Sequence, residues 1–225
     1  MDNDSFLALL RQHRAIAVIR APTVAVGLQL ANAVAAGGLR LIEITWNSAN
    51  PEVLVNKLRH QLPQCTIGIG TALSPADLTA AKTAGAQFCF CPHTNPALID
   101  LARGMSIPIV PGALTPNEIV TAWRAGAAAV KVFPVGALGG ASYVRAVRGP
   151  LGHIPLVPTG GVTVDNAAAM VQAGAIAVGL STNLFPRALV AEQNWGAIAQ
   201  ISADLVHRLR AAPQITLFDD SGNQQ

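Results

Sequence analysis

Residues 128–134, Ala-Ala-Val-Lys-Val-Phe-Pro, form a short apolar run that contains a single lysine and ends at a proline. Similar runs rich in Ile and Val precede and follow it, and their starts lie about twenty to twenty-seven residues apart, enough for one helix and two turns. The eight runs cover residues 15–20, 39–45, 66–71, 88–92, 107–113, 128–134, 154–161 and 175–182. This repetition is typical of parallel strands that alternate with helices, and it predicts an α/β fold, a single (β/α)8 TIM barrel.

The segments between these runs carry helix signals. Two of them, Ser74-Pro75-Ala76-Asp77 and Thr115-Pro116-Asn117-Glu118, each offer an N-cap side chain, a proline at the first helical position and an acid at the third. Residues 4–12 read as a short amphipathic helix placed to plug the bottom of the barrel. We therefore expect one barrel domain over residues 1–212, with this helix at its start, and a polar C-terminal tail over 213–225.

Composition narrows the functional class. Of the 225 residues, 51% are hydrophobic and 12% are charged, and the formal net charge is +3. The basic residues are scattered, which argues against nucleic-acid binding, whereas a modest positive charge suits an anionic small substrate. The N-terminus lacks a signal peptide and no apolar run is long enough to span a membrane, so we expect a cytoplasmic protein that does not bind membranes.

The cysteines and histidines do not indicate a metal site. Cys65, Cys89 and Cys91 lack zinc-ligand spacing and are expected to be free thiols, with Cys89 and Cys91 on one strand face. Of the histidines, only His93, just after a predicted strand, is placed to reach a site at the strand ends. We therefore expect no metal and no cofactor.

Two inward positions could carry chemistry, because active sites of such barrels lie at the carboxyl ends of the strands. Lys131 stands between Val130 and Val132, and inside the barrel it would be desolvated toward its neutral, nucleophilic form, which makes it a Schiff-base candidate. The alternatives are an outward lysine with its stem on apolar surface, or a structural ion pair. Glu43 shares a strand face with Thr45 and would supply proton transfer beside an inward lysine.

Anion-binding candidates follow other strands. Arg20 ends the first apolar run and needs an anionic partner, for which a substrate carboxylate would serve. Glycine-bearing loops at residues 158–163 and 179–182 follow the last two strands, where barrels of this class often bind phosphate through backbone N–H groups. The alternative for each loop is a tight turn.

Five motifs together resemble one family. Glu43-Ile44-Thr45, Gly68-Ile69-Gly70-Thr71, Pro111-Gly112, Lys131-Val132-Phe133-Pro134 and Pro158-Thr159-Gly160-Gly161-Val162 resemble the 2-keto-3-deoxy-6-phosphogluconate (KDPG) and 4-hydroxy-2-oxoglutarate (KHG) aldolases, over about residues 5 to 210. The resemblance implies a class I aldolase, a carbon–carbon lyase that cleaves KDPG reversibly to pyruvate and glyceraldehyde 3-phosphate without a cofactor. It also implies activity on KHG and a homotrimer.

The same resemblance assigns roles to residues. It makes Lys131 the Schiff-base lysine and Glu43 the general acid–base, acting through a water molecule. It makes Thr71 a contact for the pyruvyl carboxylate, with Pro92 and Phe133 shaping the pocket. The phosphate of the substrate would be bound by Thr159, Gly160, Gly161, Gly179 and Ser181.

One position departs from the family pattern. Many members carry arginine four residues after the glutamate, where this chain has Asn47. We expect Arg20 to bind the substrate carboxylate instead. Asn47 resembles the relatives that act on 2-keto-3-deoxy-6-phosphogalactonate, whereas Thr159 resembles the gluconate type, so both substrates stay open.

Other functions also stay open from the sequence. A phosphosugar isomerase or epimerase would use the same phosphate loops without imine chemistry at Lys131. A non-catalytic phosphosugar sensor would bind ligand without turnover. The same imine would also allow oxaloacetate decarboxylation as a side activity.

Overall fold

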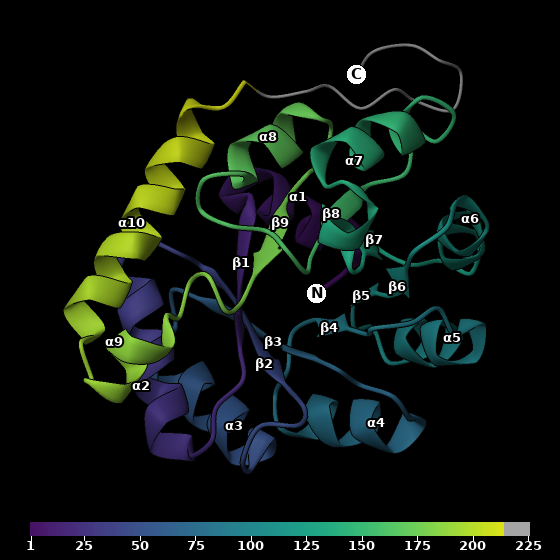
Figure 1. Ribbon diagram of the computed structural model, residues 1–225. Coiled ribbons are helices and arrows are strands. Elements are labelled where there is room, and N and C mark those ends of the chain that lie inside the picture. Colours follow the sequence, from purple (N-terminus) through teal and green to yellow (C-terminus); the bar gives the residue numbers. More distant parts are fainter. Residues whose placement is uncertain (214–225) are drawn as a thin grey trace.

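The computed structural model describes residues 1–213, shown in Figure 1. All but the first residue of the expected tail at 213–225 lie outside the described residues. The helices are α1 (Asn3–His13), α2 (Val24–Ala36), α3 (Pro51–Gln61), α4 (Pro75–Thr83), α5 (Pro96–Gly104), α6 (Pro116–Arg124), α7 (Ala141–Arg148), α8 (Ala167–Gln172), α9 (Arg187–Ala191) and α10 (Trp195–Ala211), with a 3-10 turn at Val135–Leu138. The strands are β1 (Ala15–Ile19), β2 (Leu41–Thr45), β3 (Thr66–Gly70), β4 (Cys89–Phe90), β5 (Ile109–Val110), β6 (Gly112–Ala113), β7 (Val130–Val132), β8 (Leu156–Pro158) and β9 (Val178–Leu180).

The strands form curled parallel sheets surrounded by helices (Figure 1). One sheet has six strands in the order β5-β4-β3-β2-β1-β9, and the other has three in the order β6-β7-β8. An isolated bridge between Thr159 and Gly179 joins the end of β8 to β9. The expected α/β fold is confirmed at this level, whereas a single closed eight-stranded sheet is not.

The expected strand at 107–113 explains much of this difference. It is divided at Pro111 into β5, which pairs with β4, and β6, which pairs with β7. Proline has no backbone N–H and interrupts a ladder of hydrogen bonds. The prediction of one strand here was therefore wrong, although the segment still connects the two sheets.

Side chains alternate between two faces of each strand, as strand geometry requires. On β1, Ala15, Ala17 and Ile19 pack in the core beneath the helices, whereas Ile16 and Val18 belong to a separate inner core. The face packed against helices also includes the predicted pair of cysteines, Cys89 on β4 and Cys91 just after it. The inner core consists of Phe6, Leu10, Ile16, Val18, Leu41, Phe88, Phe90, Val110, Ala128, Ala129, Val157, Ile176 and Ala177.

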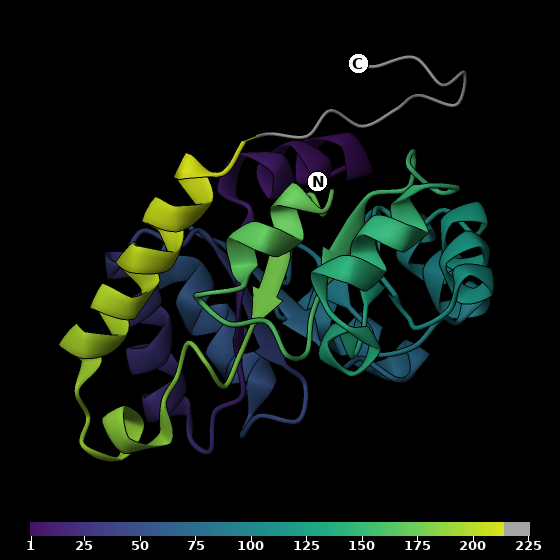
Figure 2. The ribbon, with the colours of Figure 1, turned by 45° about the horizontal axis from the view of Figure 1, so that its top comes forward.

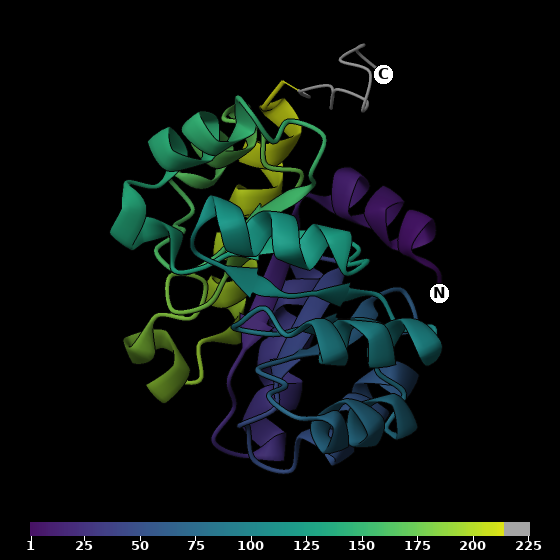
Figure 3. The same ribbon diagram turned by 90° about the vertical axis from the view of Figure 1, so that its right-hand side faces the viewer.

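Helix α1 closes the inner core at the amino ends of the strands. Its buried residues Phe6 and Leu10 join the inner core, and the rings of Phe6 and Phe88 stack with centroids 5.0 Å apart. Figures 2 and 3 show α1 across this end of the molecule. The predicted plugging helix is confirmed.

The loops after β3 and β6 begin helices through the predicted caps. Ser74 and Asp77 form a reciprocal capping box at α4, and Thr115 and Glu118 form another at α6. These bonds satisfy backbone N–H groups that a helix start leaves unpaired. Between residues 1 and 213, no helix combines the length and the apolar character needed to cross a membrane.

Candidate functional site

Glu43 lies on the inner face of β2, two residues beyond Leu41 of the inner core. It pairs in register with Val18 of β1 and Gly68 of β3, and it is 1% exposed. Its carboxylate occupies the space above Gly70, where an added Cβ atom would lie 1.6 Å from Oε1 of Glu43. The glycine of the Gly-Ile-Gly-Thr motif thus makes room for the glutamate.

Burial shifts the pKa of Glu43. Desolvation raises the pKa of this carboxyl, and the positive charges of Lys131 and Arg20 oppose that rise. Within the described residues, Oε1 has no hydrogen-bond partner. A buried acid whose pKa is raised and whose oxygen is unpaired is suited to exchange a proton with a bound molecule.

Lys131 lies on the inner face of β7. It is 6% exposed, and its Nζ atom lies 4.9 Å from the centre of the Phe133 ring and 5.9 Å from that of Phe90. The prediction of an inward lysine is confirmed, and the outward alternative is wrong. Neither ion pair found within residues 1–213 includes Lys131.

Phe90 was not among the predicted site residues. The alternation Phe88-Cys89-Phe90-Cys91 could have identified it, because it places both phenylalanines on the face opposite the cysteines. The rings of Phe88 and Phe90 meet edge to face with centroids 5.7 Å apart. Lys131 therefore stands above a column of rings that reaches down to Phe6.

Arg20 and Asn47, which the sequence analysis linked only by hypothesis, are in contact. Nε of Arg20 donates a hydrogen bond of 3.2 Å to Oδ1 of Asn47. Both line a cavity of about 710 Å³ at the carboxyl ends of β1, β2 and β9, together with Ser181 and Arg187. The guanidinium group of Arg20, the amide of Asn47 and Ser181 of the predicted phosphate loop therefore lie around one cavity.

The predicted phosphate loop continues from β8. Thr159 is buried and packs against Gly179, where an added Cβ would lie 2.6 Å from the Thr159 hydroxyl. Gly160 and Gly161 have φ values of +78° and +90°, which other residues adopt at a cost. The two glycines therefore fix the course of this loop.

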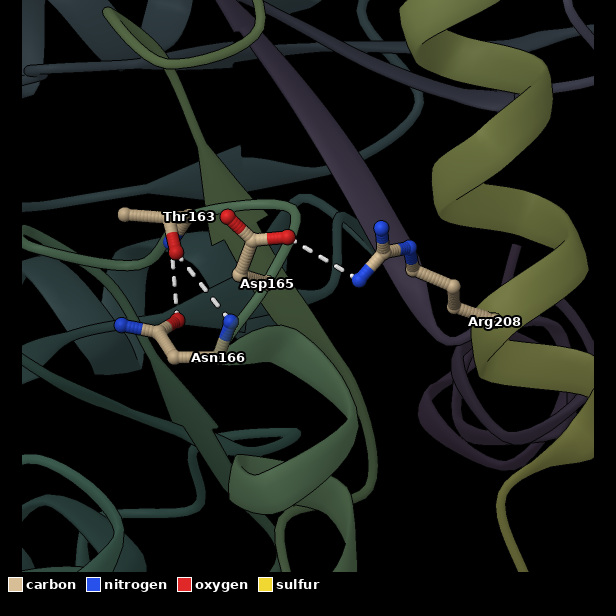
Figure 4. Close-up of polar contacts among 4 residues, drawn as sticks. All are labelled: Thr163, Asp165, Asn166 and Arg208. Carbon is tan, nitrogen blue, oxygen red and sulfur yellow. Dashed lines mark hydrogen bonds and ion pairs between the residues drawn. The ribbon is translucent and has the colours of Figure 1, made fainter.

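Side chains missed by the sequence analysis hold the loop (Figure 4). The Thr163 N–H donates to Oδ1 of Asn166 at 2.8 Å, the Asn166 N–H donates to the Thr163 hydroxyl at 3.1 Å, and the Asn166 amide donates to the Gly161 carbonyl at 3.0 Å. Arg208 of α10 pairs with Asp165 at 3.0 Å. The Thr-x-x-Asn spacing was the available signal, because it resembles a helix cap.

The remaining predicted residues lie on the neighbouring strands. Thr71 follows β3 with a φ of +63° and is half-buried. Pro92, His93 and Phe133 line a second cavity of about 360 Å³, so Phe133 borders both this cavity and Lys131. Between residues 1 and 213, no cluster of three His, Cys, Asp or Glu side chains is arranged to hold a metal ion.

Comparison with known proteins gives a consistent result. The family model described as KDPG and KHG aldolase matches residues 7–201. The chain is 33% identical to the 2-dehydro-3-deoxy-phosphogluconate aldolase of Pseudomonas aeruginosa over 89% of this chain and 91% of that protein.

Two solved structures are also similar. One, described as a native KDPGal structure, has a TM-score of 0.81 and 32% identity, covering 88% of this chain and 95% of that one. The other is the KDPG aldolase of Legionella pneumophila, with pyruvate captured at low pH as a covalent carbinolamine intermediate. It has a TM-score of 0.82 and 26% identity, covering 88% of this chain and 97% of that one.

Proposed function

Because the chain belongs to the KDPG and KHG aldolase family, we infer that it is a carbon–carbon lyase that cleaves KDPG to pyruvate and glyceraldehyde 3-phosphate. The observation that carries the mechanism is the buried lysine of β7 on the same inner face as a buried glutamate. A neutral amine forms an imine with a ketone, and a nearby carboxyl group transfers the protons that cleavage requires.

Lys131 is the proposed nucleophile. Its amine adds to the C2 carbonyl of the substrate, and loss of water gives the imine. The electrons of the C3–C4 bond then move into this imine to form an enamine, and glyceraldehyde 3-phosphate leaves. Protonation at C3 and hydrolysis release pyruvate and regenerate the amine. The rings of Phe90 and Phe133 support this role, because they hold the lysine in an apolar setting.

Glu43 is the proposed general acid–base. In its charged form it accepts the proton of the C4 hydroxyl during cleavage, by way of a water molecule, and it then returns a proton to C3. A raised pKa suits this role, because burial weakens the preference of the carboxyl group for its charged form and so favours the return of the proton. The room above Gly70 sets the position of the carboxylate.

The remaining residues are proposed to bind the two ends of the substrate. Arg20, oriented by Asn47, binds the carboxylate together with Thr71, and Pro92 borders the pocket. The phosphate is bound by the loops that contain Thr159, Gly160, Gly161, Gly179 and Ser181. The shared cavity of Arg20, Asn47 and Ser181 supports an extended anionic ligand here.

Two further proposals concern the closure of the barrel and the association of subunits. We propose that the two sheets act as one (β/α)8 barrel, because the segment through Pro111 and the Thr159–Gly179 bridge connect them. A homotrimer in the cytoplasm stays a prediction from the family. Sedimentation analysis of the purified chain tests the trimer.

Borohydride trapping tests the nucleophile directly. The protein is incubated with pyruvate and sodium borohydride, and the masses of the intact protein and its peptides are measured. We expect an adduct on the peptide that contains Lys131 and none in a Lys131→Met variant. A folded protein without any adduct would overturn the imine mechanism and favour an isomerase or epimerase.

The galactonate-type substrate is the second candidate. Asn47, which accepts the hydrogen bond from Arg20, resembles the galactonate-type relatives, and the similarity to the structure described as KDPGal also favours this substrate. Measuring kcat/KM for the two epimeric phosphorylated substrates separates the candidates. KHG and oxaloacetate in the same assay give the size of the side activities.

A further inference from the structure

A group of basic side chains lies at the amino ends of the strands, opposite the end that carries Lys131. Helices α1 and α10 both end there, near the starts of β1 and β2. A cavity of about 280 Å³ opens between them. Among the described residues its lining contains no carboxylate, and it consists of Arg11, Gln12, His13, Arg14, Gly38, Val206, Leu209 and Arg210.

Two arginines in this region are fixed by helix ends. Nη1 of Arg14 donates to the carbonyls of Leu209 and Ala212 at 2.9 and 2.8 Å. Nη1 of Arg40 donates to the carbonyls of Ala35 and Leu39 at 2.8 and 2.9 Å. Cations at helix C-termini interact favourably with the last carbonyls of the helix, and this accounts for Arg14 and Arg40.

Arg11 and Arg210 also lie in the last turns of α1 and α10, but among the described residues neither side chain donates a hydrogen bond to a carbonyl. Both are exposed, and within residues 1–213 neither takes part in an ion pair. Arg208, two residues before Arg210 on α10, does pair with Asp165 (Figure 4). The cavity is therefore bordered by two guanidinium groups that have no carboxylate partner in the described part of the chain.

The pKa of His13 responds to the positive charge of this region. Burial lowers the pKa of its imidazole, and the charges of Arg40 and Arg210 lower it further. In the described part of the chain, the charged groups that line the cavity with this ring or act on its pKa are Arg11, Arg14, Arg40 and Arg210, all of one sign. An anion in the cavity would reverse this effect and favour the protonated ring.

We propose that this cavity binds a compact small-molecule anion with two or more negative charges, a phosphate ester or a polycarboxylate, between Arg11 and Arg210. The guanidinium groups provide paired donors for such oxygens, and the cavity has room for a molecule several times the volume of a water. The site goes beyond the aldolase activity and lies at the other end of the strands from the loop of Thr159–Gly161.

The test follows His13 by NMR in the full chain, with its signal assigned by comparison with a His13→Asn variant. Inorganic phosphate and citrate are added separately at constant ionic strength. We expect a saturable rise in the pKa of His13 with at least one of them. A response to phosphate alone indicates a phosphate-ester site, and a response to citrate alone indicates a polycarboxylate site.

Matched variants locate the effect. The double variant Arg11→Gln/Arg210→Gln should bind about tenfold more weakly or worse, with unchanged aldolase turnover in the absence of added anion. Arg208→Gln removes a charge from the same helix and should bind as the original chain does. No response of His13, or an equal response in the double variant, would overturn the anion site and leave the aldolase function untouched.

Discussion

The inner faces of the strands differ sharply between their two ends. Near the amino ends, Phe6, Leu10 and Phe88 are buried and pack in the interior as part of the inner core. Two residues further along the strands, the same face carries Glu43 and Lys131. On each of these strands, the residue that packs in the core and the residue placed to carry out chemistry are thus successive side chains on the same face.

Replacement of the lysine tests the chemical end. Lys131→Met should reduce kcat for KDPG cleavage by about 10⁴-fold or more, because it removes the nucleophile. Methionine keeps the apolar stem above Phe90, so the melting temperature should change little. Steady-state kinetics and thermal unfolding measure both effects. A large loss of stability would show that this end also supports the fold.

Replacement of a ring tests the packed end. Phe88→Ala should lower the free energy of unfolding by about 3–5 kcal/mol, because Phe88 is fully buried between Phe6 and Phe90. Urea denaturation measures the loss. Leu73→Ala, at a position that is 58% exposed, is the control and should be nearly neutral.

Gly70→Ala tests the boundary between the two ends. The new methyl group would lie where the Glu43 carboxylate now is, so the glutamate must move by more than an ångström. A displacement of this size should reduce kcat about 10²-fold. Gly104→Ala is the control, because no atom lies within 4 Å of its added Cβ. Equal kinetics for both variants would contradict the assigned position of Glu43.

The pH dependence of stability gives the smallest expected effect. Burial raises the pKa of Glu43, so the folded state holds its proton to higher pH than the unfolded chain does. Its contribution to stability is present below the unfolded pKa and is lost as pH rises through the folded pKa. Glu43→Gln should therefore gain stability over the original chain as pH rises, in urea denaturation at several pH values. The opposite trend would contradict a raised pKa.

The sequence was sufficient for the features that depend on local patterns. The two-residue period placed Glu43 and Lys131 on the inner face, and the cap residues placed the starts of α4 and α6. The division at Pro111 was missed because the run 107–113 is apolar on both sides of the proline. The spacing of apolar runs predicts where strands lie, but it does not predict where the hydrogen bonding between neighbouring strands is interrupted.

Contacts between distant segments were harder to predict. The bond from Arg20 to Asn47 joins two loops 27 positions apart, and its geometry depends on how β1 and β2 end. The alternation of residues predicts the face on which Phe90 lies, and the spacing of Thr163 and Asn166 predicts a helix cap. Neither pattern predicts which distant residues these side chains contact. The basic cavity between α1 and α10 was hidden because its arginines are scattered in the sequence.

The plug formed by α1 determines how molecules travel to and from the lysine. Because Phe6, Phe88 and Phe90 pack against one another below Lys131, these rings block the approach to the lysine from the amino ends of the strands. Under the proposed mechanism, substrate, hydrolytic water and both products share one entrance. Glyceraldehyde 3-phosphate must then leave by this entrance while the pyruvyl group is still bonded to Lys131, and pyruvate follows by the same route after hydrolysis.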